Sequence, residues 1–236
     1  MSRKIKFIFF LIFITSFSVF GQNGFTLSVP IIYSNVEVAN NWSPPTAINR
    51  QNEFNGTSLG YGVNLDYSFR VPFIIKNKRI LFNIGLGYIK QKFDLQRPFD
   101  YVSPLEPIYY TDHYSYNCWQ GSVGVTYSYP VNNKYSLSGN LSYYWLTSFW
   151  QEYAPTRGYS AQANNSQIDF GRMLNLSLGI NRKLGDRFSV GLNMLIPVYV
   201  RWRNDKIFRD DPSTFYSPKF SLGTSISITY NLKKKQ

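Results

Sequence analysis

Hydrophobic and small or polar residues alternate strictly over Ser58–Phe69, where large apolar or aromatic side chains occupy the odd positions. Successive side chains of a strand point to opposite faces, so this alternation predicts a β-strand with two chemically different sides. Seven further segments repeat the pattern: Phe25–Tyr33, Ile80–Lys92, Cys118–Ser128, Tyr135–Trp145, Ile168–Ile180, Phe188–Val198 and Phe220–Tyr230. The sequence therefore predicts eight strands.

The small and polar side of these strands consists mostly of Ser, Gly, Asn and Thr, with Asp66 and Asp169 as nearly its only charged residues. A water-soluble barrel packs its apolar side chains inside and needs Lys and Glu on its outer surface. Here the polar set suits a narrow interior, where Ser or Asn would hydrogen-bond Asp66, and the apolar set suits lipid. We predict an all-β fold, an eight-stranded antiparallel up-and-down transmembrane β-barrel. The alternative is a secreted β-sandwich.

The predicted connections alternate between long and short. The long ones lie at about 34–57, 93–112, 150–167 and 201–218, and the short ones lie near Lys76-Asn77, Asn132-Asn133 and Gly185-Asp186. Outer-membrane barrels have long extracellular loops and short periplasmic turns. Odd residues point outward on both strands that flank Asn132, so the turn between them must have an odd length. A three-residue turn from Asn132 to Lys134, with Val131 opposite Tyr135, meets this condition.

The chain begins with three basic residues and an apolar run from Phe7 to Phe20, followed by Gly21. This run is shorter than the roughly 20 residues of a membrane-spanning helix, and the order of basic, apolar and small residues is typical of a secretory signal peptide. We predict cleavage after Gly21, which leaves residues 22–236 as one barrel domain. The single cysteine, Cys118, excludes an internal disulfide.

Composition supports a membrane-embedded barrel, because 18% of the residues are aromatic and only 16% are charged. An ordinary soluble domain has about a quarter of its residues charged. Aromatic residues gather toward the strand ends, as in the belts at the two headgroup layers. We expect an outer belt of Tyr33, Tyr88, Trp119, Tyr143, Trp145, Phe170, Trp202 and Phe220, and an inner belt of Phe25, Tyr67, Phe69, Tyr127, Tyr135, Phe188 and Tyr230.

Removal of Arg3, Lys4 and Lys6 with the signal peptide lowers the formal net charge by three, from +12 to +9. The remaining excess lies at the short-turn end, whereas charges in the long loops nearly balance. A basic rim beside an aromatic belt favours contact with lipid phosphates through long side chains. It lacks the groove and aromatic platforms of a nucleic-acid site, so no nucleic-acid partner is expected.

The signal-like start, the eight strands and the final Ser-Ile-Thr-Tyr-Asn-Leu make the chain similar to outer-membrane β-barrel proteins of the OmpA and OmpX type, including porin-like barrels of the Bacteroidota. The resemblance is one of pattern over the whole mature chain. It implies a barrel in the outer membrane of a Gram-negative bacterium, with outer-membrane lipids, lipopolysaccharide and the assembly machinery as partners. It implies no activity; we expect a monomer without cofactor or metal.

An eight-stranded barrel encloses an interior just wide enough for side chains or one small ligand. We therefore expect a plugged lumen, with a narrow channel as a further alternative. Long loops usually carry function, so we predict a non-enzymatic barrel that stabilises the envelope or binds ligands through its extracellular loops. The basic fourth loop offers candidate residues for lipopolysaccharide phosphate: Arg201, Arg203, Lys206 and Arg209.

The alternative function is that of a membrane hydrolase similar to lipid A deacylases, whose site uses a His-x-Ser pair on one strand with an acidic residue nearby. The only histidine, His113, stands two residues before Ser115, and Glu152 follows on the next predicted strand. The imidazole would take the serine proton while the carboxylate orients the ring. Glu152 has the parity of an inward-facing residue, so it reaches His113 only through a bulge or a loop.

Overall fold

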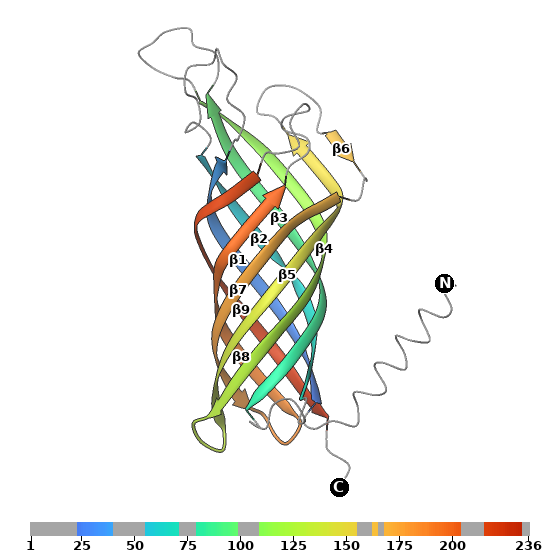
Figure 1. Ribbon diagram of the computed structural model, residues 1–236, viewed down its shortest axis with the longest axis vertical. Helices are drawn as coiled ribbons and strands as arrows, with labels where there is room; N and C mark the ends of the chain where they lie inside the picture. The colour runs from blue at the N-terminus through green and yellow to red at the C-terminus, as the bar shows by residue number, and fades with distance from the viewer. Residues whose placement is uncertain are drawn as a thin grey trace, which may run out of the picture.

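The computed structural model describes residues 23–39, 55–70, 79–98, 109–154, 162–164, 168–203 and 215–232, which form a tall β-barrel of tilted strands (Figure 1). Its strands are β1 (Asn23–Ala39), β2 (Asn55–Phe69), β3 (Ile80–Pro98), β4 (Tyr109–Pro130), β5 (Tyr135–Ala154), β6 (Gln162–Asn164), β7 (Ile168–Lys183), β8 (Phe188–Arg203) and β9 (Phe215–Leu232). All pairings are antiparallel, and β1 pairs with both β2 and β9, which closes the barrel. Eight strands form the barrel, as predicted, and the three-residue β6 pairs with the end of β5.

No described segment is an apolar helix long enough to cross a membrane.

The strands continue beyond the apolar alternation, into ranges that the pattern assigns to long loops. Strand β3 runs on to Pro98 and β4 begins at Tyr109, so the stretch between them is 99–108 rather than 93–112. The other long connections shorten in the same way, to 40–54, 155–167 with β6 inside it, and 204–214. Backbone pairing between strands does not require apolar side chains. The ladder therefore extends past the apolar segment to outward-facing polar residues such as Lys92 and Asp94.

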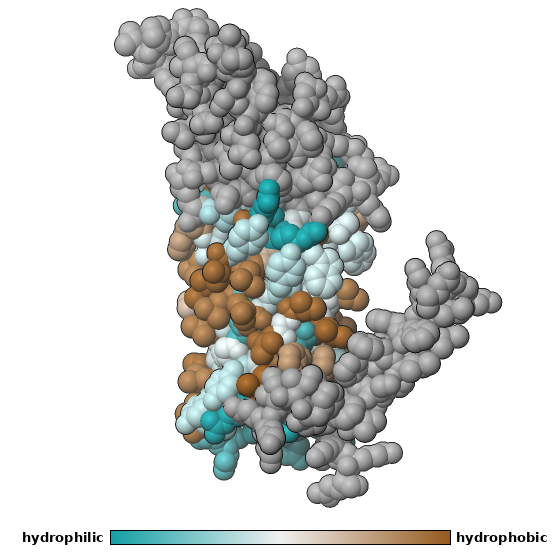
Figure 2. Space-filling model, in the orientation of Figure 1, coloured by the Kyte–Doolittle hydropathy of each residue, from teal (hydrophilic) through white to brown (hydrophobic). Residues whose placement is uncertain are grey.

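The outward face carries the apolar residues, as the alternation predicts. The odd residues of β1 from Phe25 to Tyr33 are 41–49% exposed, and Leu86 on β3 is 70% exposed. Figure 2 shows an apolar band across the middle of the visible face of the barrel, with hydrophilic side chains toward its lower end. An exposed apolar surface of this extent is typical of contact with lipid and not with water.

The lower lumen is filled by hydrogen-bonded polar side chains from neighbouring strands. Gln120 donates a hydrogen bond to Asn64, and the Ser122 hydroxyl donates to the Asp66 carboxylate at 3.0 Å. Asp66 lies opposite Gly85 on β3, where an added Cβ would collide with the carboxylate. Glycine thus provides the space for the larger polar side chain of the next strand. The expected hydrogen bond between Asp66 and an interior serine is confirmed.

The turn between β4 and β5 has the predicted length and register. The Val131 amide donates to the Tyr135 carbonyl at 3.0 Å, so these residues face each other across the turn. The Asn132 side-chain oxygen accepts hydrogen bonds from the amides of Lys134 (2.9 Å) and Tyr135 (2.8 Å). Asparagine side chains commonly stabilise turns by bonding backbone amides two residues on. The odd-numbered turn keeps odd residues outward on both strands.

Basic side chains at the lower rim lie against the aromatic belt. The Arg79 guanidinium lies 4.9 Å from the centre of the Tyr129 ring and donates to the Tyr127 hydroxyl at 3.4 Å. Arg187 donates to the Tyr230 hydroxyl at 3.3 Å. Such contacts hold the charged groups at the edge of the apolar band, where snorkelling side chains reach polar surroundings.

Candidate functional site

In the described strands, four register shifts lie toward the outer end of the barrel, and each inserts one extra residue in a strand. The extra residues are Phe149 in β5, Phe170 in β7, Val198 in β8 and Lys219 in β9. A bulge reverses which alternate residues face the lumen. If odd residues face outward in the lower part of a strand, even residues therefore face outward above its bulge, and the reverse also holds.

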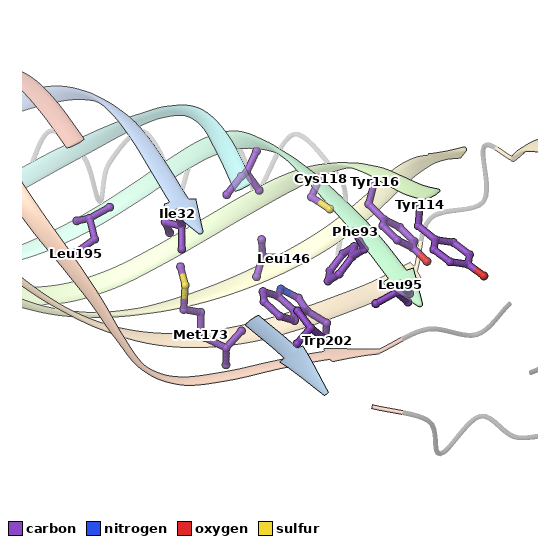
Figure 3. Close-up of a cluster of buried hydrophobic side chains, with 13 residues drawn as sticks. Ile32, Phe93, Leu95, Tyr114, Tyr116, Cys118, Leu146, Met173, Leu195 and Trp202 are labelled. Carbon is purple, nitrogen blue, oxygen red and sulfur yellow. The ribbon is translucent and has the colours of Figure 1, made fainter. Parts of the chain in front are cut away.

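A cluster of buried apolar side chains lies inside the barrel (Figure 3). At its centre Phe93 is 1% exposed and meets Tyr116 and Trp202 edge-on, with ring centres 5.8 and 5.1 Å apart. The other members are Ile32, Val36, Ile89, Leu95, Tyr114, Cys118, Leu146, Met173, Leu195 and Val200. The predicted interior was polar throughout, and this cluster was missed. Its signal was the pairs Ile31-Ile32 and Tyr88-Ile89, which place apolar residues on both faces of one strand.

Trp202 lies inside the barrel at 3% exposure, so its predicted place in the outer aromatic belt was wrong. The shift at Val198 is the reason, because Val198 and Tyr199 are both exposed and the inward face then passes to Val200 and Trp202. The outer-belt positions with exposed rings are Tyr33, Trp119, Tyr143, Trp145 and Phe220. The side chain of Phe170 lies outside the described residues.

His113 pairs with the carboxylate of Asp94, whereas the sequence predicted Glu152 as its partner. Its Nδ1 atom lies 2.6 Å from Oδ1 of Asp94, and both side chains are more than half exposed on the outer face. The two residues lie opposite each other in the ladder between β3 and β4. Asp94 was missed because it fell in a range predicted as a loop. In the described part of the chain, no three His, Cys, Asp or Glu side chains are grouped as metal ligands.

The bulge at Phe149 brings Glu152 directly opposite Ser115, on the same outward face as His113. This removes the parity conflict in the predicted site. The Glu152 carboxylate accepts a hydrogen bond from the Trp150 indole at 2.9 Å, and the carboxylate on His113 is that of Asp94. The Ser115 hydroxyl is buried without a hydrogen-bond partner among the described residues. The structure thus gathers the predicted residues on one face, with His113 and Ser115 not hydrogen-bonded to each other.

Of the predicted phosphate-binding set, Arg201 is described with its side chain. Arg201 is exposed on the outer face of β8 and lies opposite Arg172 of β7. Two arginines at one level of the barrel surface are consistent with a basic patch near the outer headgroup layer. The side chain of Arg203, and all of Lys206 and Arg209, lie outside the described residues, so the set as a whole stays a prediction.

A closed eight-stranded antiparallel barrel with an apolar outer band is a transmembrane β-barrel of the bacterial outer-membrane type. The resemblance to OmpA- and OmpX-type barrels is confirmed at the level of the fold. No protein-family model matches the sequence, and the comparison with curated proteins found no match.

Among solved structures, the chain is similar to Neisserial surface protein A, with 8% identity, 90% of this chain and 99% of that chain covered, and a TM-score of 0.43. It is also similar to OprG from Pseudomonas aeruginosa, with 8% identity, coverage of 91% and 97%, and a TM-score of 0.49. Ail of Yersinia pestis shows 12% identity, coverage of 89% and 99%, and a TM-score of 0.34. At such identities the likeness concerns the fold alone.

Proposed function

We propose that the protein is a non-enzymatic barrel of the Gram-negative outer membrane, exported with a cleaved signal peptide, that stabilises the envelope or binds ligands through its outer connections. The side chains that pack against each other inside the barrel are the observation that supports this proposal. The network around Asn64 and Asp66 occupies the lower interior and the cluster around Phe93 occupies the upper interior. A small barrel packed in this way acts through its surface rather than by conducting solutes.

The location is tested by fractionating cells that produce the full chain. We expect the protein in the outer-membrane fraction, with faster gel migration before heating than after, as for a folded membrane barrel. N-terminal sequencing of the mature protein is expected to begin at Gln22. Recovery from the soluble periplasm, with one gel position at both temperatures, would contradict the proposed location.

The closed lumen is tested by adding purified barrel to a planar lipid bilayer. Because side chains fill both halves of the interior, we expect no single-channel steps above the background of the detergent. Well-resolved steps would reject the plugged lumen and favour a narrow channel.

The two forms of the proposed role differ in what the outer connections contribute. A strain lacking the protein is complemented either with the intact chain or with a chain in which residues 99–108 are replaced by a short Gly-Ser linker, and detergent resistance is compared. Restoration by the shortened chain supports a structural role of the barrel itself. Failure of a shortened chain that is still folded and inserted supports ligand binding at the outer end. A deletion strain with unchanged resistance argues against an envelope-stabilising role.

A second candidate, a lipid ester hydrolase, is favoured by one specific observation: the bulge at Phe149 places Glu152 beside Ser115 on the face that carries the Asp94–His113 pair. Asp94 on Nδ1 would leave Nε2 of the imidazole to accept the Ser115 proton. The serine oxygen would then attack an ester carbonyl at the same depth in the outer leaflet, the imidazolium would give its proton to the leaving alcohol, and water would hydrolyse the acyl-serine.

The hydrolase is tested by the mass of diphosphorylated lipid A after incubation with the purified barrel. A catalytic site predicts loss of acyl chains with the wild-type barrel. Ser115→Ala should then lower the rate at least about 10,000-fold, the lower end of the loss seen when a triad member is removed. Asp94→Asn should also slow the reaction, and Ser227→Ala in the lumen serves as the matched control. An unchanged lipid A mass with the wild-type protein excludes the candidate for this substrate.

A further inference from the structure

Three aromatic rings form a continuous surface on the outer face of β3, β4 and β5, at the upper edge of the apolar band. Trp119 stacks on Phe149 with ring centres 5.2 Å apart, and Tyr88 lies 6.3 Å from Trp119 and 6.2 Å from Phe149. Trp119 is 58% exposed, and the Tyr88 hydroxyl donates to Asn117 at 2.6 Å. This aromatic trio is apolar toward the band and polar at its outer edge, as expected of rings at a headgroup boundary.

Two lysines follow directly above the aromatic trio on the same face of β3. Lys90 and Lys92 alternate with the buried residues Ile89, Gln91 and Phe93, so both side chains leave the barrel on its outer side. The Nζ atom of Lys92 lies 5.8 Å from the centre of the Tyr61 ring. The residues opposite the lysines on β2 and β4 are uncharged: Leu59, Tyr61, Ser115 and Asn117. Across the ladder, both positive charges thus lie between uncharged neighbours on a membrane-facing surface.

Carboxylates come next along the strands, farther from the apolar band. Asp94 follows Lys92 on the same face of β3 and is paired with His113, and the Glu152 carboxylate accepts the Trp150 indole N–H. Asp94 therefore lies one level above Lys92 along β3, whereas Glu152 lies in the ladder row of Lys92, two strands away. Along β3 the outer face passes from aromatic Tyr88 to the cationic lysines and then to acidic Asp94.

We propose that this face binds the phosphorylated headgroup of an outer-leaflet glycolipid. Acyl chains pack on the aromatic trio, phosphate groups lie at Lys90 and Lys92, and sugar hydroxyls donate to Asp94 and Glu152. Alternate residues of a strand are about 7 Å apart, so the two ammonium groups serve two separate phosphate contacts. The order of aromatic, cationic and acidic residues along β3 matches the order of acyl chain, phosphate and sugar in such a lipid, and Glu152 adds an oxygen acceptor beside the row of Lys92. This site is separate from the predicted basic set on β8 and rests on the outer-membrane location proposed above.

The experiment measures binding of diphosphorylated lipid A to the folded barrel in detergent by native mass spectrometry, with a two-chain phosphatidylglycerol as the competing probe. The variant is Lys90→Gln with Lys92→Gln, which removes both charges. Each basic residue near anionic headgroups raises the affinity roughly fivefold. We therefore expect the variant, which lacks two such charges, to bind lipid A about 30-fold more weakly than the wild type. Lys90→Arg with Lys92→Arg keeps the charges and should bind within about threefold of the wild type.

The matched control is Arg182→Gln with Lys183→Gln, which removes the same charge from the exposed lower rim. Basic residues of the lower rim also meet lipid phosphates, so the control should lose clearly less lipid A binding than the Lys90/Lys92 variant. Three results would overturn the proposal: unchanged binding by the Lys90/Lys92 variant, an equal loss in the control, or equal affinity for phosphatidylglycerol. Gel migration before and after heating verifies that each variant is folded. Lipid binding is measured on folded protein in vitro, whereas the outer-membrane location is tested by cell fractionation. A failure of the proposed lipid site is therefore distinguishable from a failure of the proposed location.

Discussion

Replacement of Leu192 by arginine tests whether the apolar band contacts lipid. Leu192 lies on the outer face of β8, is 62% exposed, and is flanked in the ladder by the exposed side chains of Ile180 and Ile226. Leu184 is similarly exposed, at 59%, but lies in the turn between β7 and β8, where its amide donates to the Phe188 carbonyl. The same Leu→Arg change can therefore be made within the band and at its edge.

The effect of a Leu→Arg change on the free energy of unfolding depends on whether the surface faces water or lipid. On a surface in water, a substitution of this kind changes the free energy of unfolding by about 0.5 kcal/mol or less. On the lipid face of a barrel, arginine costs about 2–4 kcal/mol near the bilayer midplane and about 0–1 kcal/mol near the interface. We expect Leu192→Arg to be less stable than Leu184→Arg by about 2–3 kcal/mol, or about 30- to 150-fold in the unfolding equilibrium constant.

The assay is a guanidinium titration of the barrel in phospholipid vesicles, followed by tryptophan fluorescence and by the heat-dependent gel shift. Equal midpoints for the two variants, both within about 0.5 kcal/mol of the wild type, would refute the argument. The apolar band would then face water, as in the alternative of a secreted β-sandwich.

Three further changes test the interior and the belt in the same titration. Phe93→Ala should cost about 3–5 kcal/mol, because it empties the centre of the buried cluster, and a cost below about 1 kcal/mol would show loose packing. Gly121→Val should displace Trp145, whose ring occupies the space of the missing side chain, costing about 1–3 kcal/mol and changing tryptophan emission; unchanged emission would contradict this packing. Asn64→Ala should cost about 1–3 kcal/mol, because the buried Gln120 amide loses its acceptor, and a neutral result would show that the network does not stabilise the lumen.

Much of the barrel could be predicted from local pattern. The alternation over Ser58–Phe69 identified a strand and both of its faces, and the absence of charges on either face identified lipid as the outer solvent. The odd length of the turn at Asn132 followed from the parity of the two flanking strands, and the backbone hydrogen bonds confirm it. These properties depend on neighbouring residues in one segment, and a sequence displays them directly.

The outer end of the barrel was decided by tertiary structure. The inward position of Trp202 and the outward position of Glu152 both follow from single extra residues, Val198 and Phe149, whose presence shows only when a strand is paired with its partner. The Asp94–His113 pair likewise depends on the register between β3 and β4. Alternation within a strand is local, and the sequence determined it. Register across strands is set by pairing between distant segments, so only the assembled barrel brings these side chains together.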